Sequence, residues 1–143
     1  MFNANHQQNN RLLRIYFVGG WFQFVLFLSV ITFLSLTPNP GSAFEHASDK
    51  VLHVIGWSCM AISLGVPWLV SVVFNQKTLF YHLQRYSISV VFLFLYSIII
   101  EVVQQYTGRQ FSGLDIVANA VGVLIGVLVV RLFFNMKMKH KIG

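Results

Sequence analysis

Composition and charge argue against a soluble protein. The chain has 143 residues, of which 56% are hydrophobic and only 10% are charged, whereas soluble domains contain about 25% charged residues. A chain with so few charged residues cannot cover its surface as a soluble protein does. The composition therefore argues against a soluble enzyme, a disordered tail or a nucleic-acid-binding module, despite an isoelectric point near 9.8. The length fits one domain, and the single cysteine, Cys59, allows no intrachain disulfide. The composition therefore predicts a polytopic membrane protein.

Four apolar segments account for most of the chain, and they cover residues 15–36, 51–74, 86–103 and 114–134. At about 1.5 Å per residue, each helix would cross a hydrocarbon core of about 30 Å. The apolar runs are continuous rather than alternating, which favours helices over a β-barrel. We therefore expect an all-α fold with four transmembrane helices.

The chain divides into a membrane domain and two tails. The four segments form one domain over residues 15–134, preceded by a tail over 1–14 and followed by a basic tail over 135–143. Asn and Gln dominate the first ten residues, which we expect to be disordered. The first apolar segment is too long for a secretory h-region and no A-x-A-like site follows it, so we interpret it as an uncleaved signal anchor.

The basic residues predict the orientation. In a model with four spans, eight of them fall on one side of the membrane: Arg11, Arg14, Lys77, Arg85, Arg131, Lys137, Lys139 and Lys141. Only Lys50 and Arg109 fall on the other side. Because cytoplasmic loops are enriched in Lys and Arg, both termini are expected to be cytoplasmic. The basic C-terminal tail is interpreted as a topology determinant that touches anionic lipid.

Nearly all the remaining ionisable and amide groups gather at the opposite, outer end of the predicted helices. The candidates are Asp49, Lys50, His53, Glu101, Gln104, Arg109, Asp115 and Asn119, with Glu45 in the first outer loop. The i,i+4 spacings of Asp49 with His53 and of Asp115 with Asn119 allow each pair to share a helix face. The convergence of these pairs on one membrane face predicts a polar site there.

Several of these residues can have a purely structural role instead of a functional one. Asp49 can cap the second helix, and Asp115 fits a capping box with Ser112. Glu101 follows a long uncharged stretch, where an unpaired carboxylate is costly, and Lys50 or Arg109 can serve as its partner. Further along, the Gly122-x-x-x-Gly126 motif predicts a close approach of two helices.

Five short motifs follow one another along the chain: Ser35-Leu36-Thr37-Pro38, Asp49-Lys50-x-x-His53, Glu101-x-x-Gln104, Arg109-x-x-Ser112-x-x-Asp115 and Asn119-x-x-Gly122-x-x-x-Gly126. Their order and spacing resemble those of the VanZ-like family of small bacterial membrane proteins. The resemblance implies a multi-pass protein of the bacterial cytoplasmic (inner) membrane, and its motif positions include all eight candidate residues. The founding member is associated with low-level resistance to teicoplanin, a role that need not extend to this chain.

Two functional hypotheses follow. In the first, a non-catalytic module binds an envelope lipid, a lipid-linked precursor or a glycopeptide, or stabilises a partner protein. In the second, an enzyme acts on an anionic lipid at the outer leaflet. Glu101, His53 and Asp49 would then supply acid–base chemistry, while Lys50 and Arg109 hold the headgroup with Gln104, Asp115 and Asn119.

Other functions have less support in the sequence. No ionisable residue stands at mid-membrane, which argues against a transporter. No spacing is diagnostic of a metal site, and neither a metal nor another cofactor is expected. Binding of a divalent cation by Asp49 and Asp115 stays an open alternative. Nucleic acid is not expected as a partner, and the oligomeric state is not predicted.

Overall fold

Four long helices make up the protein. A computed structural model describes residues 2–38, 49–74, 79–108 and 111–142. These residues form four helices and no strand: α1 (Phe2–Leu36), α2 (Asp49–Phe74), α3 (Leu79–Gln104) and α4 (Gly113–Ile142). Each helix contains a stretch long and apolar enough to cross a membrane. The predicted all-α architecture with four spans is therefore confirmed.

The helices extend further than the apolar segments. The expected disorder of the first ten residues is wrong, because α1 already begins at Phe2. Residues 2–14 contain neither Gly nor Pro, so nothing in the sequence interrupts the helix before its apolar part. α3 begins at Leu79 instead of residue 86. Its Arg85 is exposed near the start of the helix, where a long basic side chain can reach the headgroups.

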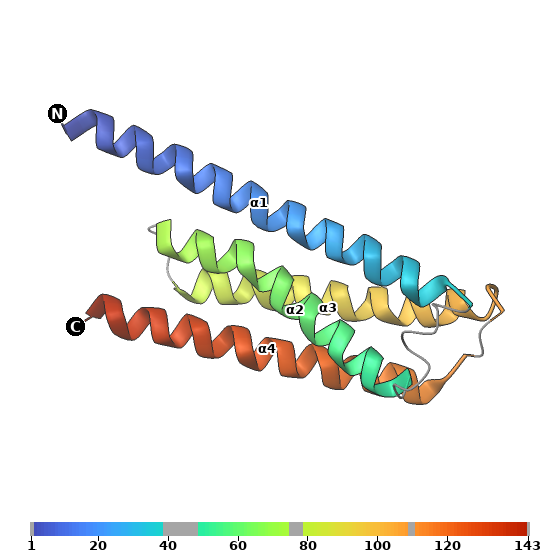
Figure 1. Cartoon of the computed structure of the whole chain (residues 1–143). Helices are drawn as coiled ribbons and strands as arrows, with labels where there is room; N and C mark the ends of the chain where they lie inside the picture. The colour runs from blue at the N-terminus through green and yellow to red at the C-terminus, as the bar shows by residue number, and fades with distance from the viewer. Residues whose placement is uncertain (1, 39–48, 75–78, 109–110, 143) are drawn as a thin grey trace.

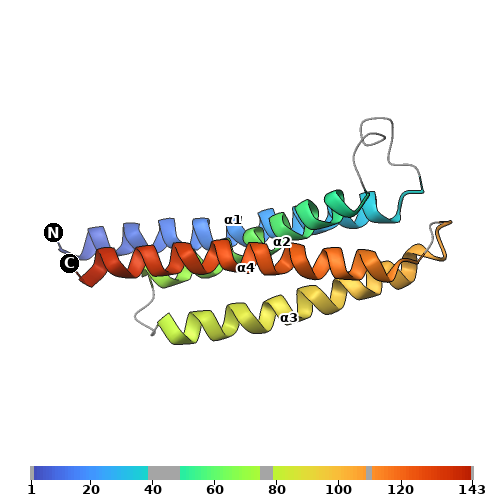
Figure 2. The same ribbon diagram turned by 90° about the horizontal axis from the view of Figure 1, so that it is seen from below.

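The bundle has two distinct ends. The start of α1 and the end of α4 lie at one end (Figure 1). The starts of α2 and α4 lie at the opposite end, beside the end of α3 (Figure 2). α2 packs against all three other helices and most extensively against α4, whereas α1 makes no packing contact with α4 within the described residues. α2 is thus the central helix, and the side of the membrane that each end faces remains a prediction from the basic residues.

A small apolar core holds the bundle together, and lipid-facing side chains surround it. The buried core residues are Trp57, Met60, Ala61, Leu64, Tyr86, Leu93, Val123, Val130 and Phe134. Large apolar side chains such as Phe22, Phe92 and Leu124 are exposed on the outer faces. Lipid tails can cover such surfaces, so helix association in a membrane depends on close packing rather than on burying apolar area from water.

The closest packing occurs between α2 and α4 and confirms the expected role of the two glycines. A Cβ atom on Gly122 would lie 2.5 Å from the Val54 carbonyl oxygen, and one on Gly126 would lie 2.6 Å from the Ala61 Cβ. The Ser58 hydroxyl also donates a 2.9 Å hydrogen bond to the Gly122 carbonyl. Only glycine allows the two backbones to come this close. This contact fixes how the first turns of α2 and α4 face each other.

Candidate functional site

The end of the bundle where α2 and α4 begin and α3 ends contains most of the predicted site residues. Asp49, Lys50 and His53 stand in the first turns of α2, Glu101 in the last turn of α3, and Asp115 and Asn119 at the start of α4. We call these six residues the polar cluster. The predicted site residue Arg109 and the loop residue Glu45 lie outside the described residues.

The α2–α4 contact explains why the polar cluster forms. Both helices begin at this end of the bundle, so they run in the same direction from it (Figure 1). Gly122 packs against Val54, and Asn119 lies about one turn before Gly122. This register places Asn119 beside His53, and Asp115 one further turn back comes within 4.0 Å of the Lys50 Nζ.

The buried part of the polar cluster is a hydrogen-bonded chain of three side chains from three helices. The His53 Nδ1 lies 2.8 Å from the Asn119 Oδ1, and the Asn119 Nδ2 donates to the Glu101 Oε1 at 3.2 Å. The same Glu101 oxygen lies 3.4 Å from the His53 Nδ1. Glu101 and Asn119 are fully buried and His53 is almost so. The network therefore joins α2, α3 and α4 at their ends.

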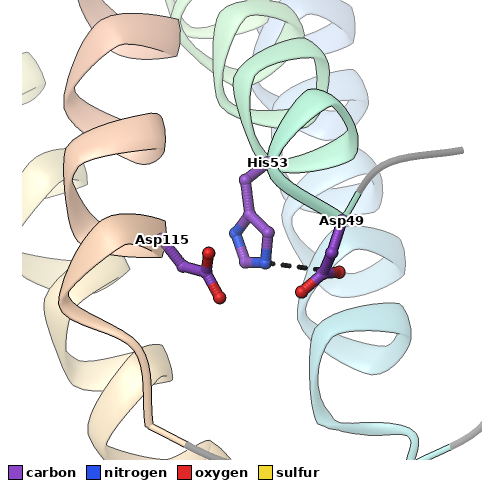
Figure 3. Close-up of side chains that lie close together, drawn as sticks. All are labelled: Asp49, His53 and Asp115. Atoms are coloured by element: carbon purple, nitrogen blue, oxygen red, sulfur yellow. Dashed lines mark ion pairs between the residues drawn. The ribbon is translucent and has the colours of Figure 1, made fainter.

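The outer part of the polar cluster is more open. Figure 3 shows the imidazole of His53 between the carboxylates of Asp49 and Asp115. The His53 Nε2 lies 3.8 Å from the Asp49 Oδ1, and the Lys50 Nζ lies 4.0 Å from the Asp115 Oδ1. The side chains of Asp49 and Lys50 are about half exposed, whereas that of Asp115 is only 8% exposed. The polar cluster thus has ionisable groups both at its exposed outer edge and in its buried interior.

The neighbours of Glu101 differ in part from those expected. Lys50 was one of two expected partners, but its ammonium lies near Asp115. Among the described residues, Glu101 instead contacts His53 and Asn119. Lys50 does not pair with Glu101 because it precedes His53 by almost one turn and therefore lies nearer the end of the bundle than the buried Glu101. The other expected partner, Arg109, is outside the described residues.

Gln104, which was predicted to contact a ligand, is buried beside the polar cluster. Its Nε2 donates a 2.9 Å hydrogen bond to the carbonyl oxygen of Ser35, close to the end of α1. The neighbouring Gln105 is exposed. Gln104 therefore connects α3 to α1, a contact that helical spacing alone could not reveal because Ser35 contributes a backbone atom.

Comparison with known proteins shows which family the chain belongs to. The family model described as VanZ/LLP1 matches residues 2–134. The chain belongs to the VanZ/LLP1 family. The matched region contains the whole polar cluster, the first three membrane spans and all but the last two residues of the fourth, so the resemblance drawn from the motifs is confirmed. No curated protein and no solved structure matches the chain.

In this VanZ/LLP1 protein, the hydrogen bonds assign the proton on His53. The NH₂ group of Asn119 donates to Glu101, so the amide oxygen faces His53. A carbonyl oxygen only accepts hydrogen bonds, so the His53 Nδ1 carries the proton. In a neutral imidazole, the Nε2 lone pair then faces the Asp49 side of the site.

The burial of charge at this end of the VanZ/LLP1 chain is costly. Removing a carboxylate from water carries a penalty of several kcal/mol after relaxation, which good partners offset only in part. Glu101 is fully buried and Asp115 is 5% exposed, and both belong to a membrane-spanning helix. Ionisable groups at such positions typically mark a functional site.

Proposed function

We propose that the polar cluster binds the anionic headgroup of an amphiphilic cell-envelope molecule, either a lipid or a lipid-linked precursor, in the bacterial cytoplasmic membrane. The exposed cation of Lys50, next to buried ionisable groups of the membrane-spanning helices, is the observation that carries this proposal. The contact between α2 and α4 does not need a buried carboxylate, because glycines and apolar side chains already pack these two helices together.

Lys50 is the residue best suited to contact an anionic headgroup. Its side chain is 53% exposed at the start of α2, where lipid headgroups would lie. The distance of 4.0 Å to Asp115 is longer than a hydrogen bond, so its N–H donors can turn toward a phosphate. An amphiphile would keep its tail against the exposed apolar faces of the helices.

Lipid binding can be tested with a matched pair of ligands. The purified full-length chain in zwitterionic nanodiscs is titrated with a polyprenyl phosphate and, separately, with the polyprenol of the same length. We expect saturable binding of the phosphate and much weaker binding of the alcohol. The Lys50→Gln variant should weaken phosphate binding, whereas Arg85→Gln, which removes an exposed cation from the start of α3, should not. Equal binding of both ligands, or equal effects of both variants, would contradict the proposal.

The association of the founding VanZ-like protein with teicoplanin suggests a second assay. We propose that any glycopeptide resistance conferred by this chain requires the polar cluster. If expression in a susceptible Gram-positive host raises the inhibitory concentration of teicoplanin, Asp115→Asn should abolish the increase at equal protein levels. If the Asp115→Asn variant raises the inhibitory concentration as much as the wild type does, resistance does not depend on the polar cluster.

Acid–base catalysis on the same lipid is the alternative function, and one observation favours it. The imidazole of His53 lies between two carboxylates, with Glu101 on its Nδ1 side and Asp49 on its Nε2 side. This arrangement suits a histidine that takes a proton at Nε2 while a carboxylate orients the ring. Release of the headgroup by the purified chain would support catalysis, provided that His53→Gln and Glu101→Gln remove it. Wild-type function in Glu101→Gln and Arg109→Ala at normal protein levels would rule it out.

A further inference from the structure

We infer that Asp49, His53 and Asp115 form a binding site for one divalent cation at the outer edge of the polar cluster. One ligand atom from each side chain lies within 4.8 Å of the other two. The three residues come from the first turns of α2 and α4, and Figure 3 shows their side chains converging on one small region. The set combines one imidazole nitrogen with two carboxylate oxygens, which suits ions such as Zn²⁺ and Mn²⁺.

The separations fit a shared ion better than direct contacts between the side chains. The His53 Nε2 and the Asp49 Oδ1 are 3.8 Å apart, which is too far for a hydrogen bond. Two ligand atoms on one tetrahedral ion, each about 2.1 Å from it, lie about 3.4 Å apart. The ligand atoms of this cluster lie within 4.8 Å of one another, so binding an ion requires them to close by up to about 1.4 Å.

A buried oxygen of Asp115 supplies an independent observation. Asp115 is only 5% exposed, and its Oδ1 accepts no hydrogen bond from any described residue. The Lys50 Nζ lies 4.0 Å from this oxygen, beyond hydrogen-bond distance. A buried carboxylate oxygen without a donor is costly, and a bound cation would remove this cost.

Hydrogen bonds within the polar cluster orient the His53 ring for metal binding. The Nδ1–H group donates to Asn119, which is itself held by Glu101. Histidines that bind metals through one nitrogen commonly donate the other N–H to a carboxylate or carbonyl group, which fixes the tautomer and the ring. Glu101 and Asn119 are therefore positioning residues that keep the Nε2 lone pair directed toward the two aspartates.

Three protein ligands leave coordination positions open for another molecule. Structural zinc sites usually have four protein ligands, whereas three are typical of sites that bind water or a substrate. Asp49, Glu101 and Asp115 outnumber the one described cation of the cluster, Lys50, so their repulsion limits how tightly an anionic headgroup binds to Lys50 alone. A divalent ion would offset this repulsion and could bridge the aspartates to a phosphate. This bridging role rests on the proposed function, whereas the ion site itself does not.

Metal titration without lipid tests the site directly. The full-length chain, stripped with a chelator and held in detergent micelles, is titrated separately with Zn²⁺ and Mn²⁺ by calorimetry. Co²⁺ then reports the ligands by its visible absorption. We expect one ion per chain, an affinity at least tenfold lower in Asp115→Asn and in His53→Gln, and loss of the Co²⁺ bands in His53→Gln. Asn119→Ala should weaken binding by about 10- to 100-fold, the usual effect of removing a group that orients a metal ligand.

Two further variants separate an ion site from a network of ion pairs. Lys50→Met should raise the affinity for the divalent ion, because it removes a cation that competes for Asp115. His82→Gln changes a histidine near the start of α3, at the other end of the bundle, and should leave the affinity unchanged. Circular dichroism and size-exclusion chromatography confirm that each variant is folded. No binding above a micelle blank, or equal affinity in Asp115→Asn and wild type, would overturn the inference. Because no lipid is present, failure here is distinct from failure to bind the polyprenyl phosphate.

Discussion

The carboxamide oxygen of Asn119 lies 2.8 Å from the His53 Nδ1, although 66 residues separate the two in the chain. This contact joins the starts of α2 and α4, and the Asn119 NH₂ group extends it to Glu101 at the end of α3. Three helix ends are thus held by one amide, which satisfies both a carboxylate and an imidazole. The effect of Asn119 on stability can be measured separately from any ligand.

Removing this amide should destabilise the bundle. In Asn119→Leu, the buried side chains of Glu101 and His53 each lose a hydrogen-bond partner. Such a loss costs about 1–3 kcal/mol, and more when the group is charged. Unfolding of the purified chain in mixed detergent and SDS micelles measures this change. The control is Val121→Leu on the exposed face of α4, which should change the free energy of unfolding by less than about 0.5 kcal/mol.

The glycine contact between α2 and α4 should tolerate no side chain. In Gly126→Leu, the new Cβ would lie 2.6 Å from both the Ala61 Cβ and the Ser58 carbonyl oxygen, so the helices must separate. We expect a loss of about 1–3 kcal/mol or more in the same unfolding assay. Gly19→Ala is the control, because a Cβ on Gly19 has no atom within 4 Å. Equal destabilisation by the two changes would show that the contact does not determine the packing.

The contact between α3 and α1 should depend on Gln104 and not on its neighbour. Gln104→Leu removes the donor to the Ser35 carbonyl and should lower the free energy of unfolding by about 1–2 kcal/mol. Gln105→Leu changes an exposed glutamine one residue further on and should have little effect. If the two variants unfold alike, the hydrogen bond from Gln104 contributes nothing measurable.

The distribution of basic residues predicts that the polar cluster faces away from the cytoplasm. Cys59 is first replaced by alanine, and a single cysteine is then introduced at Lys50 or at Arg85, near opposite ends of the bundle. A membrane-impermeant maleimide added to intact cells should label Lys50→Cys at once. It should label Arg85→Cys only after the cells are permeabilised. The reverse pattern would invert the proposed topology.

The sequence by itself determined the class of the protein and the number of its spans. Long uncharged segments have few alternatives to transmembrane helices, because a backbone in lipid must satisfy its own hydrogen bonds. The same segments placed the polar residues near helix ends, and the Gly122-x-x-x-Gly126 motif indicated a close helix contact. Helix bounds were less predictable, since α1 continues back to Phe2 through residues that are mostly polar.

Only the tertiary structure decided which polar groups meet. Helical spacing relates residues on one helix, as it does Asp49 and His53, but it contains no information on how two helices align. That alignment depends on the depth at which Gly122 packs against Val54, which turns Asn119 toward His53 and brings Asp115 near Lys50. The pairing of charges at this end of the bundle is therefore a consequence of helix packing.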